Sequence, residues 1–117
     1  MEAMIDVDMV FAALSDGTRR DILRRAMNGE EGVQDLSGHY PMSFAAVQKH
    51  IAVLERAGLI TKHRSGRRKL IRTRMAAVRE AQRLLDYYEE LWRGRVDLMA
   101  EIISENEENR DDSHSRQ

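Results

Sequence analysis

The sequence contains no cysteine, which excludes a disulfide framework, a thiolate metal site and a thiol nucleophile. No apolar run approaches the roughly 18 residues that a membrane-spanning helix needs. No basic-then-apolar signal peptide opens the chain, and aromatic residues make up only 5% of it. From these absences we expect a soluble cytoplasmic protein without a membrane partner.

Motifs for catalysis are missing as well. The chain has no glycine-rich loop of the kind that cradles phosphates. Ser37 with His39, and Asp86 with Glu89, are near neighbours in the sequence, but neither pair has a third residue to position it. We therefore expect neither an enzyme nor a cofactor.

The length of 117 residues allows one domain with a small core, so a second subunit is expected to add stability. Apolar residues end near Ser104, and the segment 105–117 is polar and mostly acidic. The sequence thus predicts a folded domain over residues 1–104 and a disordered acidic tail over 105–117.

Positive and negative charges are segregated along the chain, although the formal net charge is only -1. The stretch from Arg56 to Arg79 contains many lysines and arginines but no aspartate or glutamate, whereas the tail is rich in acids. Because binding to nucleic acid depends on the local charge, the net value does not argue against it.

Apolar spacing predicts short helices at 7–14 and 18–27, the second capped by Thr18, and helical turns at 33–36. A helix from Ser43 to Ala57 follows, with Ser43 as its N-cap and Gly58 just beyond its end. Strands at 60–64 and 69–73 flank a turn at Ser65-Gly66, and a long helix begins at Met75. The fold class is mainly α with a small β-hairpin.

The turns at 33–36 and the helix 43–57 have the spacing of a helix-turn-helix motif. Many helical hairpins share this spacing, but here a hairpin with lysine and arginine at its exposed positions follows at once. This combination is typical of a winged helix-turn-helix, in which a helix enters the DNA major groove and a charged ribbon holds neighbouring phosphates.

Three sequence motifs now point to one family. They are ALSDGTRRDIL at 13–23, PMS at 41–43 leading into AVQKHI at 46–51, and LERAGLI at 54–60. With them, the segment from Phe11 to Thr73 resembles the arsenic-repressor (ArsR) family of bacterial winged-helix transcription repressors. The resemblance implies a homodimer, formed through the first and last helices, that binds an operator of inverted-repeat character.

Carried over position by position, the family's recognition helix falls on Ser43 to Ala57. Gln48 is the best candidate for a base contact, because glutamine pairs bidentately with adenine. Phe44 fits either contact with a thymine methyl group or packing onto the preceding turn as core. His50 fits a structural role or a phosphate contact better than metal ligation. The expected DNA-binding residues are Ser43, Phe44, Ala45, Gln48, Lys49 and His50 in the helix, and Arg64, Arg67, Arg68 and Lys69 in the wing.

The metal-binding residues of the family's metal sensors are absent. Those members carry a Cys-x-Cys pair in the first helix of the motif, or Asp, His and Glu ligands along the terminal helix. The corresponding segment 33–36 has no cysteine, and the terminal helix up to Ser104 has carboxylates but no histidine. The chain is thus most similar to the metal-independent branch, which carries a tryptophan such as Trp92, and we expect no metal site.

The terminal helix has more apolar residues than one narrow stripe, which favours burial against a partner subunit. Tyr87, Tyr88 and Trp92 fit either the core of that interface or the lining of a small effector pocket between subunits. The expected dimer-interface residues are Val10, Phe11, Leu84, Tyr88, Leu91, Trp92, Leu98, Met99 and Ile102.

A winged helix also serves in some proteins as an interaction module, since fold alone does not settle function. The alternative hypothesis is that the basic surface holds an acidic protein partner. The outward face of the helix 43–57 separates the two hypotheses, because only a DNA reader depends on Gln48 for base discrimination.

Overall fold

The computed structural model describes residues 4–115, with side chains described up to residue 109. The chain divides into two compact units, Met1–Gln82 and Arg83–Gln117, and each is described by itself. In the described part, no helix combines the length and the apolar character that crossing a membrane requires.

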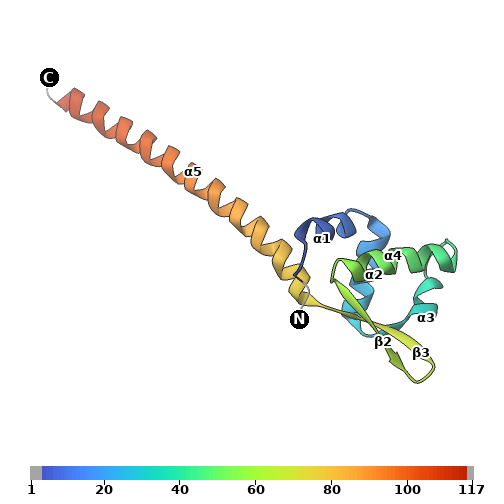
Figure 1. The fold of residues 1–117 in the computed structure, drawn as a ribbon. Coiled ribbons are helices and arrows are strands. Elements are labelled where there is room, and N and C mark those ends of the chain that lie inside the picture. Colours follow the sequence, from blue (N-terminus) through green and yellow to red (C-terminus); the bar gives the residue numbers. More distant parts are fainter. Residues whose placement is uncertain (1–3, 116–117) are drawn as a thin grey trace. The chain divides into compact units, whose positions relative to one another are not determined.

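The first unit contains the helices α1 (Val7–Leu14), α2 (Gly17–Asn28), α3 (Val33–Ser37) and α4 (Phe44–Arg56). It also holds the strands β1 (Glu31–Gly32), β2 (Ile60–Ser65) and β3 (Arg68–Thr73), and the beginning of α5 (Met75–Ser115). Figure 1 shows the β2–β3 hairpin projecting from the cluster of the four short helices. The expected winged helix-turn-helix, mainly α with a small sheet, is confirmed.

Helix α2 begins earlier than its sequence predicts. The N-cap is Asp16, whose side chain accepts a hydrogen bond from the Arg19 backbone N–H, so the prediction of Thr18 as cap is wrong. Aspartate is a preferred N-cap residue, and the negative charge of its carboxylate is also stabilised by the positive end of the helix dipole.

The sheet has three strands rather than the two of the predicted hairpin. In the order β1-β3-β2, all pairs are antiparallel, and β1 adds the pairs Glu31↔Ile71 and Gly32↔Leu70. Two residues are too few to show an alternating pattern, so the polar segment Glu30-Glu31-Gly32 is predicted from sequence as a loop rather than as a strand. The added strand ties the wing to the segment just before α3.

The core of the first unit draws on all four short helices, the hairpin and the first turns of α5. The largest fully buried side chains are Ile22, Leu36, Ile51, Leu54, Leu59, Ile60, Ile71, Val10 and Val47. No polar or charged residue among those described is buried with them. Because α3, α4 and both long strands share this core, their relative positions are fixed by the same packing.

The end of α4 has the geometry that turns the chain into the wing. The Leu59 N–H bonds to the Leu54 carbonyl and the Gly58 N–H to the Glu55 carbonyl, both at 3.0 Å, which is a Schellman motif. Gly58 has φ +80°, a conformation that favours glycine. The predicted stop at Ala57-Gly58 is confirmed, and Leu59 goes directly into the core.

Helix α5 continues to Ser115, whereas the sequence predicts a disordered tail over residues 105–117, of which 116 and 117 lie outside the described residues. The segment after Ser104 contains neither glycine nor proline, and its several glutamates are good helix formers. Low hydropathy alone therefore does not end the helix, since nothing in this segment terminates it.

Candidate nucleic-acid interface

Helix α4 buries one face and presents the other. The hydroxyl oxygen of Ser43 accepts a hydrogen bond of 3.1 Å from the Ala46 N–H, which confirms Ser43 as the N-cap. Val47, Ile51 and Leu54 are buried, as their spacing of three and four residues predicts. The outward face is therefore free for another molecule, and it carries Phe44, Ala45, Gln48 and Lys49, all exposed.

Phe44 is the large apolar residue on this outward face. Its side chain is 42% exposed, and it lies outside the cluster of core residues and of the side chains packed against them. Gln48 follows four residues later, so the two side chains lie on the same side of the helix, one turn apart. From the sequence, Phe44 is expected either to contact a thymine methyl group or to pack onto the preceding turn as core. Its exposed position does not fit packing as core.

A cleft of about 260 Å³ separates the start of α4 from the wing. Phe44 and Gln48 line it from α4, and four residues before and in α3 line it on another side. All four basic residues expected in the wing also line it. The full lining is Gly32, Val33, Gln34, Asp35, Phe44, Gln48, Arg64, Arg67, Arg68 and Lys69. The structure thus brings six of the expected DNA-binding residues to one concave surface, while Ser43, Ala45, Lys49 and His50 lie outside its lining.

The wing is less uniformly positive than its sequence indicates, because acids from other segments pair with it. Arg68 forms an ion pair with Asp35, and the Nε atom of Arg72 lies 2.8 Å from a carboxylate oxygen of Glu30. Lys62 pairs with Glu55 over 3.6 Å. These contacts leave Arg64, Arg67 and Lys69 as the cleft cations that form no ion pair with a described side chain.

His50 lies on α4 outside the cleft, beside the junction of α1 and α2. Its Nδ1 atom is 3.3 Å from the Arg19 guanidinium, which also donates to the Ala13 carbonyl at 2.8 Å and the Ala12 carbonyl at 3.0 Å. Since arginine has only donors, Nδ1 accepts and the proton of the neutral ring sits on Nε2. This contact fits the structural role considered for His50.

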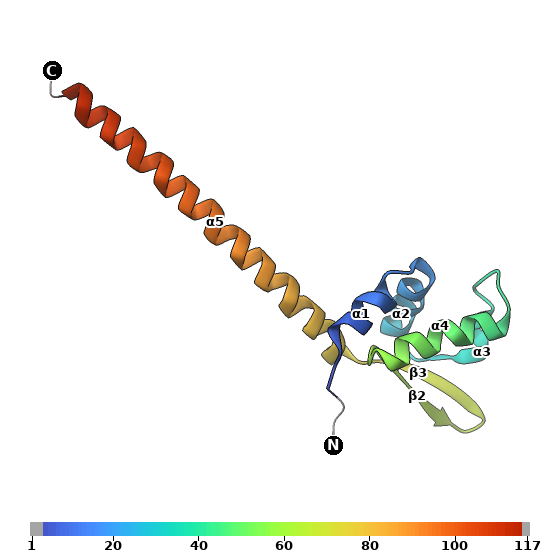
Figure 2. The same ribbon diagram turned by 45° about the horizontal axis from the view of Figure 1, so that its top comes forward.

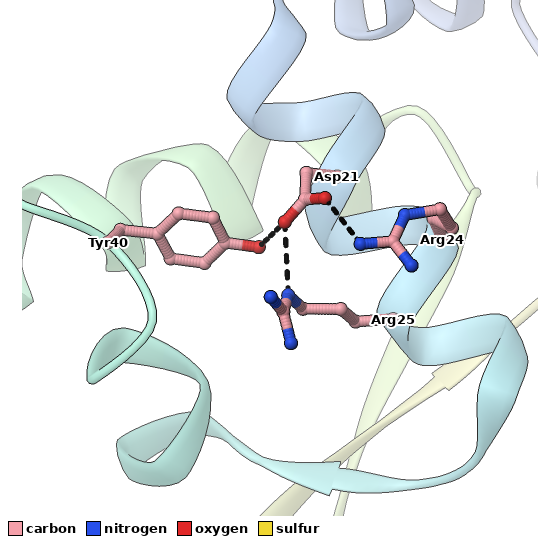
Figure 3. Close-up of polar contacts among 4 residues, drawn as sticks. All are labelled: Asp21, Arg24, Arg25 and Tyr40. Atoms are coloured by element: carbon pink, nitrogen blue, oxygen red, sulfur yellow. Dashed lines mark hydrogen bonds and ion pairs between the residues drawn. The ribbon is translucent and has the colours of Figure 1, made fainter.

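A polar network that the sequence does not predict joins α2 to the turn of the motif (Figure 3). The Tyr40 hydroxyl donates to an Asp21 carboxylate oxygen at 2.7 Å, Arg25 donates to the same oxygen at 3.0 Å, and Arg24 donates to the other at 2.7 Å. The guanidinium carbon of Arg25 also lies 5.9 Å from the centre of the Tyr40 ring. Asp21 belongs to α2, so the network connects α2 with the segment between α3 and α4.

These contacts shift the pKa values of both partners. The hydrogen bond from Tyr40, followed by those from Arg24 and Arg25, lowers the pKa of Asp21 far below its ordinary value. Burial, followed by the bond to Asp21, raises the pKa of Tyr40 to about 12. The helical spacing of Asp21, Arg24 and Arg25 was the available signal, but nothing in the sequence connects that group with Tyr40.

Among the residues whose side chains are described, the structure shows no group of three or more histidines, aspartates or glutamates that could hold a metal ion. His39 and His63 lie in the turn before Pro41 and in strand β2, respectively. His114 lies outside the described side chains.

Comparison with known proteins gives consistent matches. The family model described as "Bacterial regulatory protein, arsR family" matches residues 16–62. The transcriptional regulator Rv2034 of Mycobacterium tuberculosis is 37% identical over 75 residues, which are 62% of this chain and 70% of that protein. The transcriptional repressor SdpR of Bacillus subtilis is 37% identical over 57 residues, 49% of this chain and 63% of that protein.

Among solved structures, an ArsR-like transcriptional regulator from Rhodococcus sp. RHA1 superposes with a TM-score of 0.72 at 30% identity. The match covers 82% of this chain and 91% of that one. It extends the agreement from the segment that the family model matches to the fold around it. The chain belongs to the ArsR family of bacterial regulatory proteins.

Proposed function

We propose that the protein is a homodimeric, DNA-binding transcriptional repressor. It reads base edges in the major groove with the outward face of α4 and holds the DNA backbone with the wing. The observation that carries this proposal is the cleft, because Gln48 and Phe44 of α4 face it together with the three unpaired cations Arg64, Arg67 and Lys69. A base-reading side chain and phosphate-binding side chains are thereby on one surface.

The dimensions of α4 suit the major groove. Its 13 residues make a rod about 20 Å long, and the groove is about 12 Å wide and admits one helix. Gln48 lies in the N-terminal half of the helix, which is the end that contacts bases in helix-turn-helix proteins. The amide of Gln48 then donates to and accepts from adenine, and Phe44 presents an apolar edge to a thymine methyl group.

Dimerisation rests on the apolar side chains of α5. Leu84, Leu91 and Leu98 recur every seven residues, and Leu85, Trp92 and Met99 run directly beside them. Trp92 is 63% exposed, and most of the stripe is exposed to a similar degree. A stripe of this width on one chain favours burial against a second copy. Two copies related by a twofold axis would place their α4 helices in successive major grooves about 34 Å apart, on a pseudo-palindromic site.

Val10 does not join this proposed interface. Its side chain is 0% exposed within a single chain and packs in the core of the first unit, whereas Phe11 remains partly exposed. The helical spacing of Val7, Val10, Phe11 and Leu14 could not separate a face toward the protomer's own core from a face toward a partner. On α1 we retain Phe11 as an interface residue.

Repression is extended to this chain from its Bacillus relative, which is named a transcriptional repressor. A dimer seated on a pseudo-palindromic site near a promoter blocks transcription by occupying the DNA. A bacterial DNA-binding regulator acts on the chromosome, which lies in the cytoplasm. We therefore propose that the protein is cytoplasmic.

Selection from a random pool of duplexes, followed by fluorescence-anisotropy titration, tests the proposal. The full chain should enrich a pseudo-palindromic site and bind it more tightly than mixed-sequence DNA. Gln48→Ala should lose about 1–3 kcal/mol of this preference, because it removes a bidentate base contact. The matched control Gln82→Ala changes an exposed glutamine outside the cleft and should keep the preference.

Two results would contradict the proposal. One is failure of the selection to enrich any sequence. The other is a Gln48→Ala variant that discriminates as well as the unmodified chain, which would favour the alternative of an interaction module that holds an acidic protein partner.

A further inference from the structure

The cleft contains one acidic side chain. Asp35 lines it together with the cations of the wing, and its side chain is 66% exposed. The other ionisable residues of the lining are all basic. A carboxylate therefore stands on the surface where the proposed function places the DNA backbone.

This carboxylate is paired with the wing by a contact that the fold accommodates. Asp35 in α3 and Arg68 in β3 are 33 positions apart in sequence, and a carboxylate oxygen of Asp35 accepts from the Arg68 guanidinium. A Cβ atom at Gly32 would lie 2.9 Å from Nη2 of Arg68 and 3.1 Å from Oδ2 of Asp35. The absence of a side chain at Gly32 thus leaves the space in which the two groups meet.

We propose that Asp35 competes with DNA phosphate for Arg68 and thereby restrains the affinity of the protein for DNA of any sequence. The inference rests on the proposed function and adds a residue that sets the strength of backbone binding. If Arg68 stays with Asp35, it neutralises no phosphate. If Arg68 turns to a phosphate, the Asp35 carboxylate is left unpaired beside the negatively charged DNA. In both arrangements the carboxylate weakens binding.

The expected size follows from counterion release. A released Arg68 that contacts one more phosphate makes the slope of log K against log salt steeper by about 0.9. At about 0.1 M salt, this slope corresponds to roughly eightfold tighter binding. Because phosphate contacts carry no sequence information, mixed-sequence DNA should gain as much as the selected site.

The test is an anisotropy titration of the full chain with a labelled mixed-sequence duplex of about 30 base pairs, repeated between about 50 and 200 mM salt. Asp35→Asn should bind roughly eightfold tighter at about 0.1 M salt with a steeper slope, and Asp35→Ala should do the same. The matched control is Glu30→Gln, which removes the same charge from the Arg72 and His63 contacts outside the cleft. It should change affinity by less than about twofold. Thermal melts would establish that each variant folds.

Equal or weaker binding by the two Asp35 variants would overturn the inference, since it would mean that Asp35 positions Arg68 for DNA. An equal gain in Glu30→Gln would overturn it as well, because the effect would then reflect total charge. If the unmodified chain shows no salt-dependent DNA binding, it is the proposed function that fails. The two failures are therefore distinguishable.

Discussion

The hydroxyl group of Tyr40 donates a 2.7 Å hydrogen bond to the carboxylate of Asp21, and this bond joins helix α2 to the turn of the helix-turn-helix motif. Tyr40 lies three residues before Ser43, the N-cap of α4. The segment just before α4 is therefore connected to α2 by a hydrogen bond between side chains. Figure 2 shows α3 and α4 joined by this turn, with α2 beside α4.

Tyr40→Phe should lower the free energy of unfolding by about 1–2 kcal/mol, because it removes one hydrogen bond to a charged, partly exposed carboxylate and keeps the ring. Urea denaturation followed by circular dichroism measures the change. Tyr87→Phe is the control, since Tyr87 is exposed and its hydroxyl makes no hydrogen bond with a described residue. Equal stability of the Tyr40 and Tyr87 variants would show that the bond contributes nothing.

The same pair predicts a dependence of stability on pH in two windows. Asp21 has a pKa below its ordinary 3.8 in the folded chain, so its contribution is present above that value and is lost as the pH falls toward the folded pKa. The pKa of Tyr40 is raised from 10.0 to about 12, so its contribution is present below pH 10 and is lost as the pH rises toward 12. Melting temperatures measured across the pH range should therefore fall at acid pH, as Asp21 is protonated, and at alkaline pH, as Tyr40 is deprotonated. The difference between the unmodified chain and Tyr40→Phe should be constant near neutral pH and shrink above pH 10. A difference that persists unchanged to pH 12 would contradict the prediction.

Local patterns in the sequence predicted the elements that form the interface. The spacing of Val47, Ile51 and Leu54 identified the buried face of α4, and the signals at Ser43 and Gly58 identified its ends. These features are readable because each depends on residues within a few positions of one another. The outward direction of Gln48 followed from the same periodicity, whereas Phe44 stayed open between the outward face and the core until the structure showed it exposed.

Contacts between distant segments were not predictable. The pairs of Arg68 with Asp35 and of Arg72 with Glu30 span 33 and 42 positions, and no local pattern indicates which acid meets which base. The sequence shows a basic wing without acids of its own, and it does not show that acids from other segments pair with that wing. Strand β1 was missed for a related reason, because its pairing partner Ile71 lies 40 positions away from Glu31.

Gly58→Ala should destabilise the chain by about 1–2 kcal/mol, because a residue with a Cβ atom is strained at a φ of +80°. The nearest side-chain atom to a new Cβ is 3.9 Å away, so strain of the backbone rather than a clash is the cause. Gly94→Ala is the matched control within α5, where nothing lies within 4 Å and alanine is the better helix former. Denaturation should therefore show opposite signs for the two substitutions, and equal signs would contradict the argument.

Arg67→Gln should make the slope of log K against log salt shallower by about 0.9, which is the value for one lost phosphate contact. The reason is that Arg67 lines the cleft and forms no ion pair with a described side chain. Its effect should be similar on selected and mixed-sequence DNA, since phosphate contacts do not report sequence. Arg79→Gln changes an exposed arginine outside the cleft and should leave the slope unchanged. Titrations at several salt concentrations measure both, and equal slopes for the two variants would remove Arg67 from the interface.

Leu91→Lys should convert the dimer to a monomer, because it places an unpaired charge in the middle of the stripe along α5 that we propose faces the partner. Glu90→Lys is the control, since it puts the same side chain at the adjacent exposed position and outside that stripe. Sedimentation equilibrium measures whether each variant is a monomer or a dimer. Thermal melts of each full-length variant test that the first unit still folds. In a dimer, binding of one α4 helix holds the second α4 helix close to its own half of the DNA site, which raises the affinity of the pair. A monomer lacks this gain, so Leu91→Lys should also weaken binding to the selected duplex by about 100-fold or more. A monomeric unmodified chain would contradict the dimer, and a monomeric Leu91→Lys variant that binds the selected duplex normally would contradict the pseudo-palindromic reading of the site.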